Sequence, residues 1–285
     1  MKELVEIYEV GPRDGLQNEK SEIPVADKVA LVDCLSRAGF ARIEVASFVN
    51  PSRVPQMAGS AEVLAGITRS TDIRYAALTP NMRGYDDALA AKADEIAVFA
   101  SASEGFSKAN INATIADSIA RFEPILKAAR HIDLPVRGYV SCVTDCPYDG
   151  PSDPAKVAEV ADQLFSMGCY EVSLGDTLGQ ARPDSIARML LAVRERVPVT
   201  RLSGHYHDTA GRALDNIDAS LSLGVRVFDA AVGGLGGCPF APGAAGNVAT
   251  ENVTAHLERL GYATGLDMEV LIQAAAMARD MRGGR

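Results

Sequence analysis

Eight short apolar runs rich in β-branched residues recur along this chain, and a segment with helical periodicity follows most of them. This alternation is typical of a parallel sheet whose strands are joined by helices. The starts of successive runs lie 22 to 40 residues apart, which is the size of one strand–helix unit of a (β/α)8 barrel. The expected strands are residues 5–10, 41–48, 73–78, 95–100, 135–142, 171–177, 201–207 and 225–232.

The segments between these runs supply the helices. A doubly wound sheet is the competing architecture, but it usually has fewer strands and a G-x-G-x-x-G loop after the first one. Here residues 11–15 read Gly-Pro-Arg-Asp-Gly instead. We therefore expect an α/β fold, a (β/α)8 TIM barrel with extra C-terminal helices. The expected helices are residues 26–38, 61–67, 111–130, 154–167, 183–197, 211–223, 247–260 and 268–281.

Length and charge exclude several classes of protein. The chain has 285 residues, 47% of them hydrophobic, and no linker is evident, so we expect one barrel domain over residues 1–285. A net charge of −9 without a basic stripe argues against a nucleic-acid partner. No apolar run approaches the ~20 residues of a membrane span. The start of the sequence has no apolar signal region, so we expect a cytoplasmic protein.

The five cysteines, at positions 34, 142, 146, 169 and 238, are an odd number and form no C-x-x-C pair. This pattern favours reduced cytosolic thiols over a disulfide framework. Cys142 and Cys146 lack the second Cys/His pair that a structural zinc site needs.

Two of the four histidines, His205 and His207, lie two residues apart at the end of the seventh expected strand. Residues i and i+2 of a strand point to the same face, so both imidazoles can aim at one divalent metal ion. A lone histidine is more often a core or surface residue, but the pairing favours a metal site.

Other polar residues fall at the same end of the expected strands. Arg13 and Asp14 follow the first strand, and Glu44 lies within the second. Active sites of such barrels form at the carboxyl ends of the strands. Each residue also has a purely structural interpretation. Glu44, for example, could be a charged strand residue with no catalytic role. The remaining candidates are Asp176, which ends the sixth strand, and Cys238 and Asn247, which follow the eighth.

The types of residue at this end of the barrel limit which metal ions and which reactions the site could support. Asp14, His205 and His207, with Asn247 as a further candidate, make a mixed nitrogen and oxygen set that suits Mg²⁺ or Mn²⁺. Such a metal leaves positions open for substrate oxygens. Arg13 can hold an oxyanion. Cys238, in a Gly-rich loop, can move a proton. These groups fit carbon–carbon bond cleavage or formation through an enolate.

Three segments carry a family resemblance. Residues 10–20, 204–209 and 233–247 closely resemble the 3-hydroxy-3-methylglutaryl-CoA (HMG-CoA) lyase family, and the likeness continues through residues 137–142 and 171–177. The third segment, Gly-Gly-Leu-Gly-Gly-Cys-Pro-Phe-Ala-Pro-Gly-Ala-Ala-Gly-Asn, is long and specific. The Arg-Asp pair is less so, because it is shared with other barrel metal lyases and condensing enzymes.

The resemblance implies an acyl-CoA substrate, cleavage of HMG-CoA to acetyl-CoA and acetoacetate, a role in leucine catabolism and a homodimer. It implies a divalent cation, Mg²⁺ or Mn²⁺, held by Asp14, His205, His207 and Asn247. No flavin, nicotinamide or pyridoxal phosphate is expected.

The resemblance also implies catalytic roles. Arg13 would stabilise the enolate, and Cys238 would transfer a proton. Glu44 and Asp176 would lie in the active site, with Asp176 a candidate for the hydroxyl proton. For substrate binding we expect Arg13, Gln17 near the metal, and Lys20 and Lys108, with Asn110, near the phosphates or adenine of CoA.

One segment departs from the family pattern. Residues 47–56 read Ser-Phe-Val-Asn-Pro-Ser-Arg-Val-Pro-Gln, where the family commonly has Ser-Phe-Val-Ser-Pro-Lys-Trp-Val-Pro-Gln. We expect this loop near the barrel mouth, so another 3-hydroxyacyl-CoA, such as citramalyl-CoA, stays open as the substrate. A Claisen-type 2-oxo acid condensing synthase and a non-catalytic barrel remain as alternatives. The synthases carry further sequence after their barrels, and the chain ends soon after its last expected helix.

Overall fold

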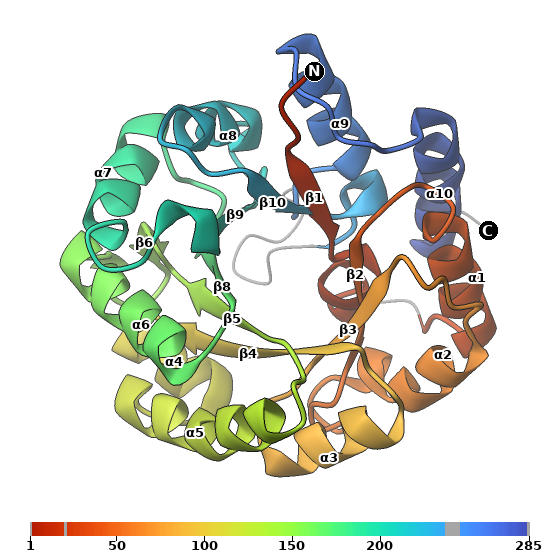
Figure 1. Ribbon diagram of the computed structural model, residues 1–285, viewed down its shortest axis with the longest axis horizontal. Coiled ribbons are helices and arrows are strands. Elements are labelled where there is room, and N and C mark those ends of the chain that lie inside the picture. Colours follow the sequence, from red (N-terminus) through yellow and green to blue (C-terminus); the bar gives the residue numbers. More distant parts are fainter. Residues whose placement is uncertain (1, 20–21, 237–245, 284–285) are drawn as a thin grey trace.

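The computed structural model describes residues 2–19, 22–236 and 246–283. Within these residues, eight parallel strands close into a barrel with helices around its outside, which confirms the expected fold (Figure 1). The order around the barrel is β1-β10-β9-β8-β5-β4-β3-β2. The strands are β1 (Glu6–Glu9), β2 (Arg42–Ser47), β3 (Arg74–Leu78), β4 (Glu95–Ser101), β5 (Val136–Ser141), β8 (Glu171–Asp176), β9 (Leu202–Tyr206) and β10 (Val227–Ala230), and a hairpin of β6 (Asp145–Cys146) and β7 (Gly150–Pro151) lies outside the barrel.

Helices follow the strands in turn, and two of them follow the last strand, as expected. They are α1 (Val25–Leu35), α2 (Ser60–Gly66), α3 (Met82–Ala90), α4 (Glu104–Ile111), α5 (Ile115–His131), α6 (Pro154–Met167), α7 (Pro183–Val193), α8 (Ala213–Ser222), α9 (Thr250–Arg259) and α10 (Met268–Met281). Short 3₁₀ turns are η2 (Pro55–Met57), η3 (Val199–Arg201) and η4 (Val232–Gly234).

Two of these helices, α3 and α4, are not among the helices expected from the sequence. Helix α3 contains Gly84, which weakens helical propensity, but the side chain of Asn81 caps it by accepting from the Gly84 amide at 3.0 Å. Asn112, with φ of 50°, ends α4, so the helix predicted over 111–130 starts later than expected, at Ile115. This helix, α5, begins with a capping box between Thr114 and Asp117.

The middle of the barrel is filled by paired charges as well as apolar side chains. Arg137 is fully buried on β5, where it donates to Asp229 of β10 at 2.6 Å and to Glu171 of β8 at 2.8 Å. Its guanidinium lies 4.1 Å from the ring centre of Tyr8. Buried charges of this kind are tolerated because each has a partner, and removal of one partner is strongly destabilising. The network therefore ties three strands together inside the barrel.

A single turn of π-helix, η1 (Gly11–Gly15), follows β1 and carries Arg13 and Asp14 to the barrel mouth. The amides of Asp14 and Gly15 both donate to the carbonyl of Val10, at 2.8 and 3.1 Å. Gly15 is required here, because a Cβ at this position would lie 2.6 Å from Cβ of Leu235. The η1 turn therefore packs closely against the segment that follows β10.

The cysteines within the described residues, at positions 34, 142, 146 and 169, are buried free thiols, in line with the predicted absence of a disulfide framework. None of the helices built from the described residues has the length and apolar character needed to cross a lipid bilayer.

Candidate active site

A cavity of about 750 Å³ opens at the carboxyl ends of the barrel strands. Residues of η1, the loop after β2, the ends of β3, β4, β5, β8 and β9, and helices α4 and α5 line it. The loop of residues 49–54 lies at this mouth, as predicted. The lining includes Arg13, Asp14, Gln17, Asn50, Arg53, Leu78, Phe99, Phe106, Ile111, Arg121, Phe122, Tyr139, His205 and His207.

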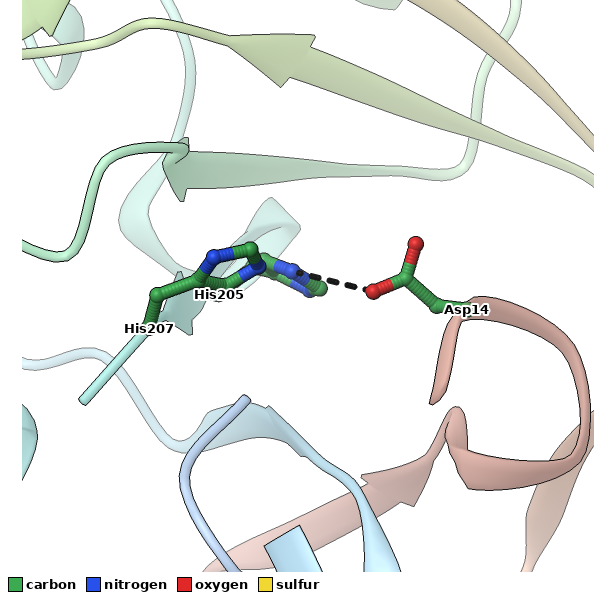
Figure 2. Close-up of side chains that lie close together, drawn as sticks. All are labelled: Asp14, His205 and His207. Atoms are coloured by element: carbon green, nitrogen blue, oxygen red, sulfur yellow. Dashed lines mark ion pairs between the residues drawn. The ribbon is translucent and has the colours of Figure 1, made fainter. Parts of the chain in front are cut away.

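Asp14, His205 and His207 converge in this cavity, with the carboxylate facing the two imidazoles (Figure 2). Nε2 of His205 lies 3.8 Å from Oδ2 of Asp14, and the two imidazole centroids are 5.4 Å apart. One potential ligand atom from each residue lies within 4.8 Å of the other two. The prediction that the H-x-H pair directs both rings toward one point is therefore confirmed.

Asp14 is held from three sides. Its Oδ1 accepts from Arg13 Nη1 at 2.7 Å and from Gln17 Nε2 at 2.8 Å, and its Oδ2 accepts from Asn247 Nδ2 at 2.8 Å. Burial alone would raise the pKa of Asp14, but Arg13 and the nearby imidazoles lower it to about 2. Asp14 is thus a carboxylate at neutral pH, and Asn247 leaves its amide oxygen as a potential ligand.

The imidazoles suit a metal as well. Burial, and then the neighbouring His205, lower the pKa of His207 to about 4, so His207 is neutral at pH 7. Nδ1 of His207 is buried without a hydrogen-bond partner. An unpaired buried nitrogen is costly, and a bound cation would satisfy it. The donor set of two imidazoles, a carboxylate and an amide therefore fits a hard or borderline divalent ion.

Arg13 presents its guanidinium to the cavity, with Glu44 behind it. Arg13 Nε donates to Glu44 Oε2 at 2.7 Å, and Tyr139 Oη donates to the same oxygen at 3.1 Å. Burial raises the pKa of Glu44, although Arg13 opposes this. Glu44 is fully buried and lies outside the cavity lining, so its contact with the site runs through Arg13 and Tyr139.

Asp176 lies beneath the cavity wall, between the lining residues Gly175 and Thr177. Its oxygens accept from the amides of Gly179 at 3.1 Å and Ala181 at 3.0 Å, so it shapes the loop after β8. Burial raises the pKa of Asp176 to about 6 despite these bonds. Its expected part in proton transfer stays a prediction.

The remaining predicted residues are less closely grouped. Gln17 lines the cavity. Lys108 is exposed on α4 and does not line the cavity, although its neighbours Phe106 and Asn110 do. Cys238 and Lys20 lie outside the described residues.

Sequence reasoning missed the residues behind the histidines and at the cavity mouth. Arg137 and Asp229 are charged residues inside apolar strands, a signal that points to a buried pair. Arg53 and Arg121 line the mouth, and Arg53 belongs to the segment that departs from the family pattern.

Comparison with known proteins gives a consistent result. The family profile described as HMGL-like matches residues 4–278. A 3-hydroxy-3-isohexenylglutaryl-CoA/hydroxymethylglutaryl-CoA lyase of Pseudomonas aeruginosa is 58% identical over 95% of this chain and 90% of its own length. The mitochondrial hydroxymethylglutaryl-CoA lyase of Bos taurus is 54% identical over 95% of this chain and 84% of its own.

Comparison with solved structures also finds HMG-CoA lyases. The HMG-CoA lyase of Brucella melitensis superposes with a TM-score of 0.98 at 60% identity, covering 98% of this chain and 99% of that one. An HMG-CoA lyase of Acinetobacter baumannii, solved with coenzyme A and 3-methylmalate, has a TM-score of 0.93 at 38% identity and covers 98% and 92%. With the family profile and these relatives spanning nearly the whole barrel, the chain belongs to the HMG-CoA lyase family.

Proposed function

We propose that this protein is a carbon–carbon lyase that cleaves HMG-CoA to acetyl-CoA and acetoacetate with the help of a divalent cation. The observation that carries the proposal is the convergence of Asp14, His205 and His207 beside Arg13 in one cavity. The relatives named HMG-CoA lyase, at 50–58% identity, support it.

Asp14, His205, His207 and Asn247 would hold the cation, with Mg²⁺ or Mn²⁺ favoured by the mixed oxygen and nitrogen donors. When bound, such an ion supplies Lewis acidity and orients the hydroxyl and carboxylate oxygens of the substrate. Gln17 holds Asp14 in place through its 2.8 Å bond to Oδ1.

Arg13 would stabilise the thioester enolate that forms when the C2–C3 bond breaks, because its guanidinium is fixed in advance by Glu44 and Asp14. A preorganised donor of this kind does not have to reorient during the reaction. Glu44 then acts by positioning Arg13.

Two proton transfers are needed, and we assign them by residue chemistry. Asp176, with a pKa raised to about 6 by burial, would accept the substrate hydroxyl proton. Cys238 would deliver the proton that converts the enolate to acetyl-CoA.

The CoA moiety would leave through the cavity mouth, where Arg53 and Arg121 supply positive charge for its phosphates. Lys20 and Lys108 remain proposed contacts at its outer end. The coenzyme A complex of the Acinetobacter baumannii relative supports an acyl-CoA substrate. We also propose a single catalytic domain, a homodimer, a cytoplasmic location and a place in leucine catabolism.

A second candidate substrate carries a longer apolar group at C3. Leu78 of β3 and Phe99 of β4 line the cavity across the barrel from β9, together with Phe106 and Ile111 of α4 and Phe122 of α5. This apolar wall would receive a branched alkenyl chain. The Pseudomonas aeruginosa relative is named for such a substrate.

The test is a cleavage assay on metal-stripped protein with Mg²⁺, with Mn²⁺ and with excess chelator. HMG-CoA, its 3-isohexenyl analogue and citramalyl-CoA are offered separately. We expect acetoacetate from HMG-CoA, lost with chelator. Pyruvate from citramalyl-CoA alone would move the substrate assignment and retain the chemistry. No cleavage of any substrate with metal present would refute the proposed function.

A further inference from the structure

Asp229 lies behind His205 on β10 and is 2% exposed. Its Oδ1 accepts from Arg137 Nη2 at 2.6 Å. Its Oδ2 accepts from Arg137 Nη1 at 3.1 Å and from Ser173 Oγ at 2.8 Å, and it lies 3.0 Å from Nδ1 of His205. The fully buried Arg137 keeps this carboxylate ionised, so Asp229 can only accept hydrogen bonds. Nδ1 of His205 must therefore carry the hydrogen.

This bond decides which nitrogen of His205 is free. A neutral imidazole carries one N–H, so a hydrogen on Nδ1 leaves the lone pair on Nε2. Nε2 is also the atom that lies 3.8 Å from Asp14 Oδ2. The Tyr139 ring packs against the imidazole in a T-shaped arrangement, with the centroids 6.3 Å apart, and restricts its rotation.

His207 is held in the opposite sense. Its Nδ1 is buried without a hydrogen-bond partner. An N–H at this position would stay unpaired, whereas a lone pair there can be satisfied by a cation. The lone pair of His207 is then on Nδ1, in the buried position.

From these contacts we infer that Asp229 is a positioning residue that makes His205 a ligand through Nε2, and that His207 is a ligand through its unpaired, buried Nδ1. The two histidines are fixed as opposite tautomers before any cation binds. Arg137 completes the arrangement, because it holds Asp229 with two bonds and balances its charge. The inference rests on the proposed metal site. It assigns a tautomer to each of the two histidine ligands and identifies Asp229 as the residue that positions His205.

The tautomers can be measured without a variant of Asp229. The protein is labelled with ¹⁵N-histidine, and long-range ¹H–¹⁵N spectra are recorded on the metal-free form at a pH where both rings are neutral, and again with Mg²⁺. His205→Gln and His207→Gln assign the signals. We expect a protonated Nδ1 in His205 and a protonated Nε2 in His207. The same tautomer in both rings would overturn the inference.

A variant tests whether Asp229 acts on metal binding. Asp229→Asn removes the charge and can present its amide hydrogens to His205, which would favour the wrong tautomer. We expect Mn²⁺ affinity, measured by electron paramagnetic resonance, to fall about 10–100-fold. Ser173→Ala is the matched control, because it removes one bond to the same Oδ2 and leaves the charge and the His205 contact. We expect affinity within about threefold of wild type in this control.

Circular dichroism checks whether Asp229→Asn is folded. If this variant is unfolded, the ¹⁵N spectra of the wild type test the inference. Unchanged Mn²⁺ affinity in Asp229→Asn, or equal loss in both variants, would contradict the assignment. None of these readouts requires turnover. A wild type that binds Mn²⁺ but cleaves no acyl-CoA would refute the proposed function alone.

Discussion

Gly179 lies directly against His207: a Cβ added to Gly179 would be 2.8 Å from Cβ of His207. The residue also has φ of +63°, which disfavours any side chain. The loop after β8 therefore sets the position of a predicted metal ligand that directly follows β9.

Gly179→Ala should displace His207 and weaken metal binding by at least about tenfold, an effect of about 1.4 kcal/mol or more. The matched control is Gly211→Ala, because Gly211 has a similar φ of +67° and no atom within 4 Å of the point where a Cβ would lie. In Gly211→Ala the free energy of unfolding should fall by about 1 kcal/mol, and the Mn²⁺ affinity should equal that of the wild type. Equal affinity in the two variants would show that His207 tolerates the shift.

Arg13→Lys should separate metal binding from the chemical step. The lysine keeps a positive charge beside Asp14 but cannot reproduce the bidentate guanidinium fixed by Glu44. We expect kcat for HMG-CoA cleavage to fall about 10²–10³-fold and Mn²⁺ affinity to stay within about threefold. The surface substitution Arg69→Lys is the control. An unchanged kcat would remove Arg13 from enolate stabilisation.

Glu9 should make stability depend on pH. Burial raises the pKa of Glu9 from 4.5 to about 7, although it accepts from Gly11, Val232 and Thr250. The folded state therefore holds a proton that the unfolded state releases. This stabilisation is complete below pH 4.5 and is lost as the pH rises through about 7, at most about 3 kcal/mol.

Urea denaturation between about pH 4.5 and pH 8 checks this. Glu9→Gln, which cannot titrate, should flatten the pH dependence of the unfolding free energy relative to wild type. The exposed Glu62→Gln should leave it unchanged. A steeper fall with pH in Glu9→Gln would contradict the assigned direction.

Arg282, which follows α10, should restrain the start of the Gly-rich segment. It donates to the carbonyls of Gly233 and Gly236, each at 3.4 Å, and to that of Gly234, and it pairs with Glu19 at 3.0 Å. Arg282→Ala should speed amide hydrogen exchange in residues 233–236 about tenfold, as measured by mass spectrometry. Arg279→Ala, in the last turn of α10, is the control. Exchange at the wild-type rate would show that the contacts do not restrain this segment.

The sequence was sufficient for the barrel and for the convergence of its histidines, for identifiable reasons. Eight buried parallel strands leave an apolar signal that recurs at regular spacing. His205 and His207 are adjacent on one face of a strand, and Asp14 follows the first strand at the same end of the barrel, so strand geometry alone brings them together.

The missed features depend on contacts between distant segments. Asp229 is one charged residue in an apolar strand, and its role follows only from Arg137, 92 positions away. Helix α3 depends on the Asn81 cap, which offsets a glycine in a short helix. Asp176 was expected in the active site, and its part there stays a prediction. The two backbone amides of its own loop that bind its carboxylate are contacts that strand periodicity does not express.

The seam of the barrel also bears on biosynthesis. Strands β1 and β10 pair from Glu6 with Val227 to Glu9 with Ala230, and the Asp14–Asn247 hydrogen bond lies above them. On the ribosome, Asp14 emerges more than two hundred residues before Asn247. A nascent chain stopped before residue 205 has the arginine and carboxylate of the first turn but neither imidazole. Binding of the proposed cation would therefore belong to the last stage of folding, when the barrel closes.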